Sequence, residues 1–519
     1  MMSANARLAG TTLGHLAGIG VNTFVVCAGA RNAPLVTSLL AVCQEKEWCV
    51  YHHFDERSAA FFAMGLAKRN GEPVAILTTS GTAVAELIPA TIEAFYSGIP
   101  LILVTADRPP AFRGSGAPQA IEQPGIFGPY APVAIDVTNG NEFALLSGWS
   151  GNEPLHLNLC FEEPAAGDVC ADWEPVILSI AESEKRDDGE TLSAFCKSAD
   201  HLVVLLGELP AAWQRGVERF LAGLGVPVWA EATSGLRESR ALAGQLVRSE
   251  SLVAKLAPER ILRLGGIPTL RFWRDLENLP EIEVLSLSRN PFTGLARPSR
   301  LIVSDCFPET GTTQEGSVRD LTLLHDEKFG TALQLHPRSE PAMFCELSRQ
   351  IPPEALVFLG NSLPIREWNL AASLETPHPR TFASRGANGI DGQIATFLGL
   401  SEGESESWGI FGDLTALYDL NAPALLDQLC GGRRRCVIIN NEGGRIFSRL
   451  SSMAGMSEAH KQVTENRHSR RFVHWAAMWD FDYVCWKAGD SFPSIPGDAV
   501  VIEVLVDNES SEGFWQARK

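Results

Sequence analysis

"FGDLTALYDLNAPALLDQLCGGRRRCVIINNEGG", residues 411–444, places an acidic residue and a pair of amides after two successive apolar runs. The runs "SWGIF" and "CVII" are apolar enough to be buried strands. Asp413 follows the first, and Asn440 and Asn441 follow the second, with one helix expected between them. Parallel strands joined by a helix deliver the residues after them to one sheet edge, where ligands of open α/β sheets bind. The stretch therefore predicts a parallel α/β domain with a polar site at that edge.

The polar groups at this edge are of the kind that a divalent cation requires. Asp413, Asn441 and the carbonyl of Gly443 offer the hard oxygen ligands that Mg²⁺ prefers, and substrate phosphates often complete its shell. Gly412 lets a ligand approach the backbone closely. The sequence predicts a metal and diphosphate site here. The alternative is an aspartate that only caps its helix, beside a polar loop.

Short apolar runs alternate with helical patterns along the rest of the chain. The runs with strand character are "TFVVCAG", "WCVYHH", "PVAILTTS", "IPLILVTAD", "HLVVLLGEL", "VPVWAE", "RILRLGG", "EIEVLSLS", "RLIVSD", "ALVFLGNS" and "AVVIEVLV". Such alternation predicts an α/β protein of three doubly wound parallel-sheet domains. We expect these domains at residues 1–182, 190–335 and 340–519, with the charged stretch "AESEKRDDGE" as a linker.

Composition limits the classes of function. The chain has 519 residues, 45% hydrophobic and 20% charged, with a formal net charge of −19, which argues against nucleic-acid binding. Its 11 cysteines include no CxxC pair, so we expect free thiols and a cytoplasmic location. The start lacks a signal series, and no apolar run approaches the ~18 residues of a spanning helix. We therefore expect no membrane span.

An isolated glutamate after an early strand, together with the late "GD…NN" pair, resembles the thiamine-diphosphate decarboxylase and carboligase superfamily. Glu56 in "HHFDERSAAFFAMGLAK" matches the family glutamate that hydrogen-bonds the cofactor's aminopyrimidine ring. The resemblance implies that Glu56 promotes the ring tautomer that removes the thiazolium proton, and that it acts across a subunit interface. It also implies pyrimidine-binding, central and diphosphate-binding domains, in that order. By itself, Glu56 could be a first-turn glutamate favoured by the helix dipole.

Longer motifs are similar to one branch of this superfamily, the synthases of menaquinone biosynthesis. They are "HFDERSAAFFAMGLAK", "TTSGTAVAELIPATIEA", "LVTADRPP", "GAPQAIEQPGIFG", "GNSLPIRE", "SRGANGIDG", "GDLTALYDLNA" and "NNEGGRIFS". The resemblance implies decarboxylation of 2-oxoglutarate and conjugate addition of the four-carbon unit to isochorismate. It implies thiamine diphosphate and Mg²⁺, or Mn²⁺, as cofactors, and a homodimer or dimer of dimers.

The same resemblance assigns individual residues. At the cofactor it implies Ser384, Ile390, Gly412, Leu414, Ile446 and Phe447 in addition to Glu56, Asp413 and Asn441. Beside isochorismate it implies Arg31, Arg108 and Gln119, and around 2-oxoglutarate Ser362, Arg366 and Arg385, with Arg271 as a weaker candidate. Gln119 and Arg385 join Glu56 as expected catalytic residues. Arginine suits these substrates because its planar fork binds carboxylates. The alternatives are surface ion pairs for the arginines and a core position for Ile390.

Departures and rival functions complete the sequence reading. Ala30, Pro118 and Glu86 stand where related chains carry serine, asparagine and asparagine. The rivals are an acetolactate-synthase-like carboligase and a non-catalytic cofactor-binding paralogue. An NAD-dependent dehydrogenase is poorly supported, because no GxGxxG follows a first strand. The segment "ENRHSRRFVHW" is expected either to fold over the site or to form a solvated helix.

Overall fold

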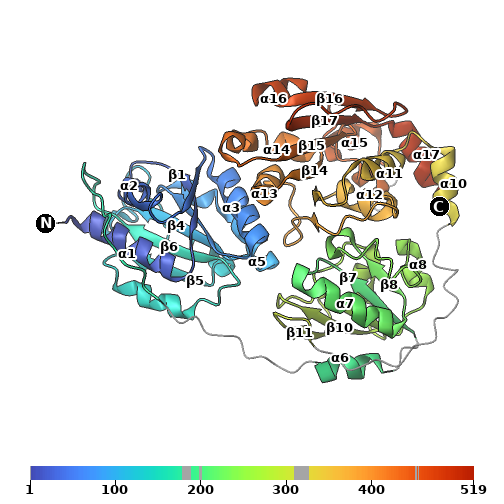
Figure 1. Ribbon diagram of the computed structural model, residues 1–519, viewed down its shortest axis with the longest axis horizontal. Coiled ribbons are helices and arrows are strands. Elements are labelled where there is room, and N and C mark those ends of the chain that lie inside the picture. The colour runs from blue at the N-terminus through green and yellow to red at the C-terminus, as the bar shows by residue number, and fades with distance from the viewer. Residues whose placement is uncertain are drawn as a thin grey trace. The chain divides into compact units, whose positions relative to one another are not determined.

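The computed structural model describes residues 2–177, 189–197, 201–308, 327–450, 453 and 455–518. Three sheets organise these residues, and every strand pair among them is parallel (Figure 1). The prediction of an α/β protein with three parallel sheets is confirmed. The strands of each sheet fall within one of the three predicted domain ranges. The predicted linker lies, except for its last two residues, outside the described residues.

The chain divides into two compact units. The first comprises Met1–Ser183, Gly386–Gly403 and Leu417–Gly431, and the second comprises Glu184–Arg385, Glu404–Ala416 and Gly432–Lys519. The first unit therefore takes two short segments from the last third of the chain.

The first unit contains a six-stranded sheet in the order β2-β1-β3-β4-β6-β5. Its strands are β1 (Thr23–Cys27), β2 (Cys49–His52), β3 (Val74–Thr78), β4 (Leu101–Asp107), β5 (Val133–Val137) and β6 (Leu155–Cys160). Its helices are α1 (Ala4–Gly18), α2 (Ala33–Val42), α3 (Glu56–Asn70), α4 (Thr82–Ala85), α5 (Ile88–Ser97) and α13 (Gln393–Leu400), with the 3-10 helix η7 (Ala422–Gln428). Strands β1, β3, β4 and β6 are buried throughout, as covered parallel strands are.

Close packing of α3 against α13 fixes the helix that begins at Glu56. A Cβ at Gly65 would lie 2.2 Å from the carbonyl oxygen of Thr396, and one at Gly399 would lie 2.3 Å from that of Phe62. Only glycine permits this approach, because both neighbours are backbone atoms. The segment 386–403 is thereby built into the first unit.

The second unit contains two sheets, in the orders β11-β10-β9-β7-β8 and β13-β12-β14-β15-β17-β16. The first sheet has β7 (Leu202–Leu206), β8 (Val228–Ala230), β9 (Arg260–Leu264), β10 (Glu283–Ser288) and β11 (Arg300–Val303). The other has β12 (Leu356–Leu359), β13 (Thr381–Phe382), β14 (Glu406–Gly412), β15 (Arg433–Asn440), β16 (Asp482–Lys487) and β17 (Ala499–Leu505). The helices are α6 (Gly189–Cys196), α7 (Ala211–Leu224), α8 (Glu250–Lys255), α9 (Arg271–Asp275), α10 (Glu327–Leu335), α11 (Glu340–Gln350), α12 (Leu363–Ala371), α14 (Asp413–Tyr418), α15 (Glu458–Thr464), α16 (Val473–Met478) and α17 (Asn508–Arg518).

The register of β14 and β15 confirms that both strands end at one sheet edge. Gly412 pairs with Ile439, so Asp413 and Asn440 directly follow the last paired residues. The single helix expected between the strands is wrong: α14 ends at Tyr418, and η7 follows as a separate 3-10 helix. Within the described ranges, every helix is too short or too polar to cross a membrane.

Candidate functional site

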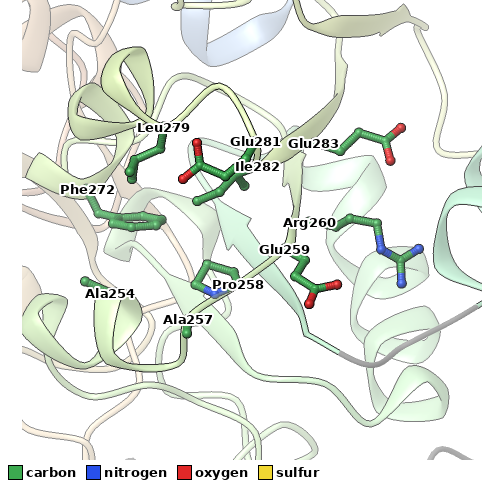
Figure 2. A pocket seen from close by; sticks show the side chains of 10 residues that line it. All are labelled: Ala254, Ala257, Pro258, Glu259, Arg260, Phe272, Leu279, Glu281, Ile282 and Glu283. Atoms are coloured by element: carbon green, nitrogen blue, oxygen red, sulfur yellow. The ribbon is translucent and has the colours of Figure 1, made fainter.

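A hollow of about 640 Å³ lies on the first sheet of the second unit (Figure 2). Its floor is apolar and includes Pro258, Phe272 and Ile282, and glutamates stand around it. None of the predicted site residues lines it. The predicted residues instead form groups elsewhere, in each of the two units.

Glu56 is the first residue of α3 and is half-buried. Asp55 caps the helix, because its side chain accepts a hydrogen bond from the Ser58 backbone N–H. Burial raises the pKa of Glu56, and the negative charges of Asp55 and Glu86 raise it further, against the opposing effect of its own backbone N–H. A carboxyl group with a raised pKa is suited to sharing a proton with a basic ring nitrogen.

A hydrogen-bonded cluster holds the start of α3 in place. The Asn421 amide donates to Asp55, and the Ser58 hydroxyl donates to Asn421 Oδ1 at 2.9 Å. His53 Nδ1 accepts from the Asp55 backbone N–H at 2.9 Å, and His53 Nε2 lies 3.2 Å from the Asn421 carbonyl oxygen. Both ring nitrogens are therefore engaged, and burial lowers the pKa of His53. This histidine is therefore a structural residue.

The predicted acceptor residues Arg108 and Gln119 lie on the loop that follows β4. Arg108 Nε donates to the Pro118 carbonyl at 3.2 Å, and its guanidinium lies over the Phe112 ring at 5.3 Å. Gln119 has a φ of +55°, unusual for a residue other than glycine. It sits against Gly81, where an added Cβ would be 3.2 Å from the Gln119 Cα. Arg108 and Gln119 thus lie on one loop whose backbone has a defined conformation.

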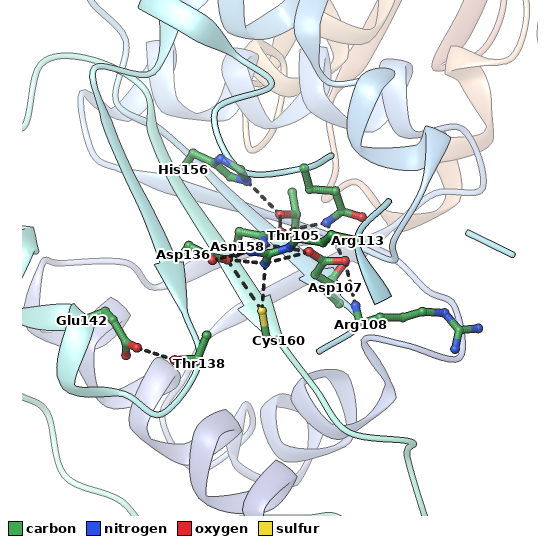
Figure 3. A network of polar contacts seen from close by, with 12 residues as sticks. Thr105, Asp107, Arg108, Arg113, Asp136, Thr138, Glu142, His156, Asn158 and Cys160 are labelled. Atoms are coloured by element: carbon green, nitrogen blue, oxygen red, sulfur yellow. Dashed lines mark hydrogen bonds and ion pairs between the residues drawn. The ribbon is translucent and has the colours of Figure 1, made fainter. Parts of the chain in front are cut away.

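A buried polar network at the ends of β4, β5 and β6 anchors this loop (Figure 3). Both terminal nitrogens of Arg113 donate to Asp136 at 2.8 Å, and one also lies 3.2 Å from Asp107. Asn158 donates to both aspartates, and Gln123 donates to Asn158 at 2.8 Å. Although burial opposes it, hydrogen bonds from Arg113 and Asn158 hold the pKa of Asp136 below its usual range.

Arg31 and Ile390 are the other predicted residues in the first unit. The Arg31 guanidinium is buried, donates to the Glu162 carbonyl at 3.0 Å and pairs with Glu163 at 2.8 Å. It is therefore held by its own unit, and a substrate role for it stays a prediction. Ile390 is half-buried rather than part of the core, which leaves part of its side chain open to a ligand.

A buried carboxylate holds the loop before Ile390. Glu93 accepts the backbone N–H groups of Gly386, Ala387 and Asn388 at 2.7, 2.7 and 3.2 Å. Burial raises the pKa of Glu93, and the Gly386 and Ala387 N–H groups oppose that rise. Three successive N–H groups around one carboxylate hold this backbone tightly.

In the second unit, Asp413 and the loop after β15 form the predicted cation site. Asp413 is 2% exposed, and its oxygens accept from the backbone N–H groups of Leu414 at 2.7 Å and Gly443 at 2.9 Å. Gly443 has a φ of +133°, and an added Cβ would lie 2.6 Å from the Glu465 carbonyl oxygen. Gly412, directly before the aspartate, is half-buried at the end of β14.

The two amides after β15 have different partners. Asn440 Nδ2 donates to Glu503 at 2.6 Å and to the Arg470 carbonyl at 2.9 Å, so this residue is structural. Asn441 Nδ2 donates to Glu340, whereas its Oδ1 is buried without a hydrogen-bond partner among the described residues. A buried oxygen without a partner, on the loop that donates to buried Asp413, fits a cation ligand, since buried polar atoms otherwise find partners. The residues present therefore fit a hard divalent cation.

Residues 465–472, which follow this loop, are not helical, and their His468 is half-buried near Asp413. Residues 465–472 connect α15 to α16, and Glu465 is fully buried. His468 Nε2 lies 3.3 Å from Asp413 Oδ2. Both expectations hold in part: His468 lies against Asp413, whereas Val473 and His474 are exposed at the start of α16 (Val473–Met478). Ile446 and Phe447, which wall the same loop, are half-buried, with Phe447 beginning η8 (Phe447–Arg449).

The predicted 2-oxoglutarate residues form a second group in this unit. Asn361 links them, because it accepts from Arg385 at 2.8 Å and donates to the Ser384 carbonyl at 2.9 Å. Ser362 has a φ of +71°, and its carbonyl accepts from Arg366 at 2.6 Å. The Ser384 hydroxyl is buried without a partner among the described residues.

Glu231, which follows β8 in the first sheet of the second unit, is a buried glutamate close to Arg366 and Arg385. Glu231 is 1% exposed and accepts the Thr269 hydroxyl at 2.6 Å. Burial raises its pKa, and the positive charges of Arg385 and Arg366 oppose this rise. Arg271 does not join the group, because its side chain is 65% exposed and lies 3.6 Å from Asp275. Its alternative as a surface ion pair is the one observed.

Several of these residues were not predicted. Glu503 and Asn158 were detectable as polar residues inside apolar strand runs. Glu340 and Glu93 gave no such signal, since each looks like an ordinary helix glutamate. Among the described residues, no group of three or more His, Cys, Asp or Glu side chains could hold a metal ion. A cation site here must therefore use amide and carbonyl oxygens.

Comparison with known proteins identifies the family of the chain. Residues 8–126 match the family model described as thiamine pyrophosphate enzyme, N-terminal TPP binding domain. The chain is 39% identical to a protein of Akkermansia muciniphila over 95% of both chains, and 39% identical to one of Bdellovibrio bacteriovorus over 99% of this chain and 98% of the relative. A Chloroflexus aurantiacus relative is 32% identical over 91% of this chain and 88% of its own. All three carry the name 2-succinyl-5-enolpyruvyl-6-hydroxy-3-cyclohexene-1-carboxylate synthase.

Proposed function

The chain belongs to the family of 2-succinyl-5-enolpyruvyl-6-hydroxy-3-cyclohexene-1-carboxylate synthases, and from this premise we propose how its residues divide the work. The protein is a thiamine-diphosphate-dependent transferase of menaquinone biosynthesis. It decarboxylates 2-oxoglutarate and joins the remaining four carbons to isochorismate by conjugate addition. The observation that carries this proposal is the buried Asn441 Oδ1 without a hydrogen-bond partner among the described residues, on the loop whose Gly443 N–H donates to buried Asp413.

Asp413, Asn441 and the Gly443 carbonyl would hold Mg²⁺, or Mn²⁺ in its place. The buried oxygen of Asn441 supports this role, as does the strained Gly443 backbone, which shapes the loop. Thiamine diphosphate, when bound, supplies the carbon that adds to the 2-oxoacid and accepts the electrons left by carbon dioxide. The second unit's Gly412, Leu414, Ser384, Ile446 and Phe447 are proposed to contact it, together with Ile390.

Glu56 would hydrogen-bond the aminopyrimidine ring and exchange a proton with it. Its raised pKa and half-buried position support this role. Around the substrates, Ser362, Arg366 and Arg385 would bind 2-oxoglutarate, and Arg31, Arg108 and Gln119 would bind isochorismate. The planar forks of guanidinium groups can bind both carboxylates of such a substrate bidentately. Arg271 is not proposed as a contact, given its exposed ion pair.

Self-association through the surface beside Glu56 is part of the proposal. Phe54, Tyr418 and Leu420 are 68%, 51% and 42% exposed, and all three belong to segments that pack at the start of α3. Large apolar side chains on one surface are typical of an interface. We propose a homodimer, or a dimer of dimers, in which Glu56 acts on cofactor held by the other copy. None of the described cysteines forms a disulfide, which supports a reducing compartment such as the cytoplasm.

The test is a two-stage assay with the purified protein. With thiamine diphosphate and Mg²⁺ present, 2-oxoglutarate should release carbon dioxide, and isochorismate should then yield the named product. Pyruvate in place of 2-oxoglutarate separates the acetolactate-synthase-like rival, because the arginines should favour a donor with a second carboxylate. Calorimetric binding of thiamine diphosphate without any turnover would instead favour a non-catalytic paralogue.

A further inference from the structure

Three charged side chains, Glu340, Glu367 and Arg449, contact one another next to the predicted cation site in the second unit. Glu340 begins α11 and Glu367 lies on α12, and each is 1% exposed. Arg449, the last residue of η8, lies between them. Its guanidinium hydrogen-bonds Glu367 and lies 3.5 Å from Glu340 Oε2. Arg449 is thus the cation that the two buried carboxyl groups share.

Glu340 also contacts the predicted metal ligand. Its Oε2 accepts a hydrogen bond from Asn441 Nδ2 at 3.3 Å. A carboxylate oxygen that accepts a hydrogen bond takes the NH₂ end of an amide. This contact therefore leaves Asn441 Oδ1 on the side of the amide away from Glu340 Oε2. Glu340 thus holds one end of the Asn441 amide and leaves the other end free to face a ligand.

We propose that Glu340 is a positioning residue that fixes the Asn441 amide with its oxygen toward the cation. The inference rests on the proposed function and adds a residue to its cation site. Glu367 contacts the Arg449 cation, Arg449 contacts Glu340, and Glu340 accepts from the NH₂ end of Asn441. The oxygen end of the Asn441 amide is then the end that a cation would bind. Partners behind a metal ligand commonly orient it in this way.

Arg449 couples this group of charged side chains to the loop that carries Ile446 and Phe447. Its guanidinium also lies over the Trp515 ring, 4.7 Å from the centroid. The end of η8 is therefore held between two carboxylates and an aromatic face. Orientation of Asn441 and position of the metal loop depend on the same buried charges.

The test compares Glu340→Gln with Glu346→Gln, a matched control on the same helix whose side chain is 41% exposed. Mn²⁺ binding is measured by electron paramagnetic resonance titration with thiamine diphosphate present, and thermal unfolding checks that each variant is folded. The glutamine introduced by E340Q can present either end of its amide, so Asn441 loses its fixed orientation. We expect E340Q to raise the Mn²⁺ dissociation constant about 10- to 100-fold, and E346Q to leave it unchanged.

A second measurement exchanges the hydrogen-bond donor at position 441 with the acceptor at position 340. It does not depend on E340Q alone being folded. In Asn441→Asp a carboxylate faces Glu340, whereas in the double variant E340Q/N441D the new glutamine can donate to it. N441D should therefore improve Mn²⁺ binding more in the E340Q background than in the wild-type background. If E340Q does not fold, tighter binding by the folded double variant than by N441D is the supporting result.

Two results would overturn the proposal. One is an E340Q protein that binds Mn²⁺ as E346Q does, and the other is an equal effect of N441D in both backgrounds. Either result leaves the proposed function standing if wild type shows metal-dependent cofactor binding. Wild-type protein without such binding would contradict the proposed function itself.

Discussion

Glu56 in the first unit and Asp413 in the second occupy the same local position, as the first residue of a helix that follows a parallel strand. Their surroundings are opposite. Glu56 is half-buried beside two further carboxylates, Asp55 and Glu86, and its pKa is raised. Asp413 is almost fully buried and accepts two backbone N–H groups, with an imidazole nitrogen 3.3 Å away.

The difference shows that two carboxylates at the same position in a helix can have opposite surroundings, which suit them to different roles. Negative neighbours and partial burial favour the protonated form, which suits exchange of a proton. Backbone N–H donors around a buried carboxylate fix the direction in which its oxygens point. Substitutions at the two carboxylates and at the residues around them test this contrast.

The largest effect is expected for Glu56→Gln. The glutamine keeps the shape but cannot exchange a proton, so carbon dioxide release from 2-oxoglutarate should slow by about 10²- to 10⁴-fold. Metal binding should be unchanged, because Glu56 has no part in holding the cation. The control is Glu72→Gln, at an exposed residue just after α3. Full activity in E56Q would contradict the role given to this residue.

Asp413→Asn should act on binding rather than on proton exchange. Loss of the charged ligand should raise the Mn²⁺ dissociation constant by at least about tenfold and weaken thiamine diphosphate binding with it. Isothermal titration of both ligands measures this. Asp427→Asn, on the exposed side of η7, should bind both normally. Unchanged metal affinity in D413N would remove the second half of the comparison.

Gly443→Ala tests whether the metal loop is shaped by backbone geometry. Its φ of +133° and the 2.6 Å approach to the Glu465 carbonyl oxygen leave no room for a Cβ. We expect a loss of about 1–3 kcal/mol in the free energy of unfolding, measured with urea. Gly444→Ala is the matched control, because its nearest neighbour at 3.1 Å is a phenylalanine side chain that can move. Equal losses in both variants would argue against a special role for Gly443.

The smallest effect concerns pH and the like charges around Glu56. Because its pKa is raised on folding, Glu56 contributes stability below its unfolded pKa, and this is lost as pH rises through the folded pKa. As pH rises through that window, the free energy of unfolding of wild type should therefore fall relative to that of E56Q. Glu86→Gln removes one negative neighbour, so the window should move to lower pH. Urea unfolding over a pH series would show whether the shift runs in this direction.

Much of the fold was predictable because burial leaves a local record in the sequence. Strands such as β3, β4 and β14 are continuous apolar runs, and all were predicted. β5, β6, β13 and β16 were missed; β6, for example, carries His156 and Asn158 within its apolar pattern. The unequal roles of Asn440 and Asn441 were also hidden, because they differ only in partners brought by distant segments.

The sequence by itself determined the three parallel α/β sheets, the polar edge after β14 and β15, and the family to which the motifs belong. These depend on the order of residues along short stretches, where apolar periodicity and strand ends are visible. Only the tertiary structure decided that Glu340 faces Asn441, which lies 101 residues away in the chain, and that Glu93 holds residues 386–388. A buried carboxylate gains its role from the donors that folding brings to it, and no local pattern records them.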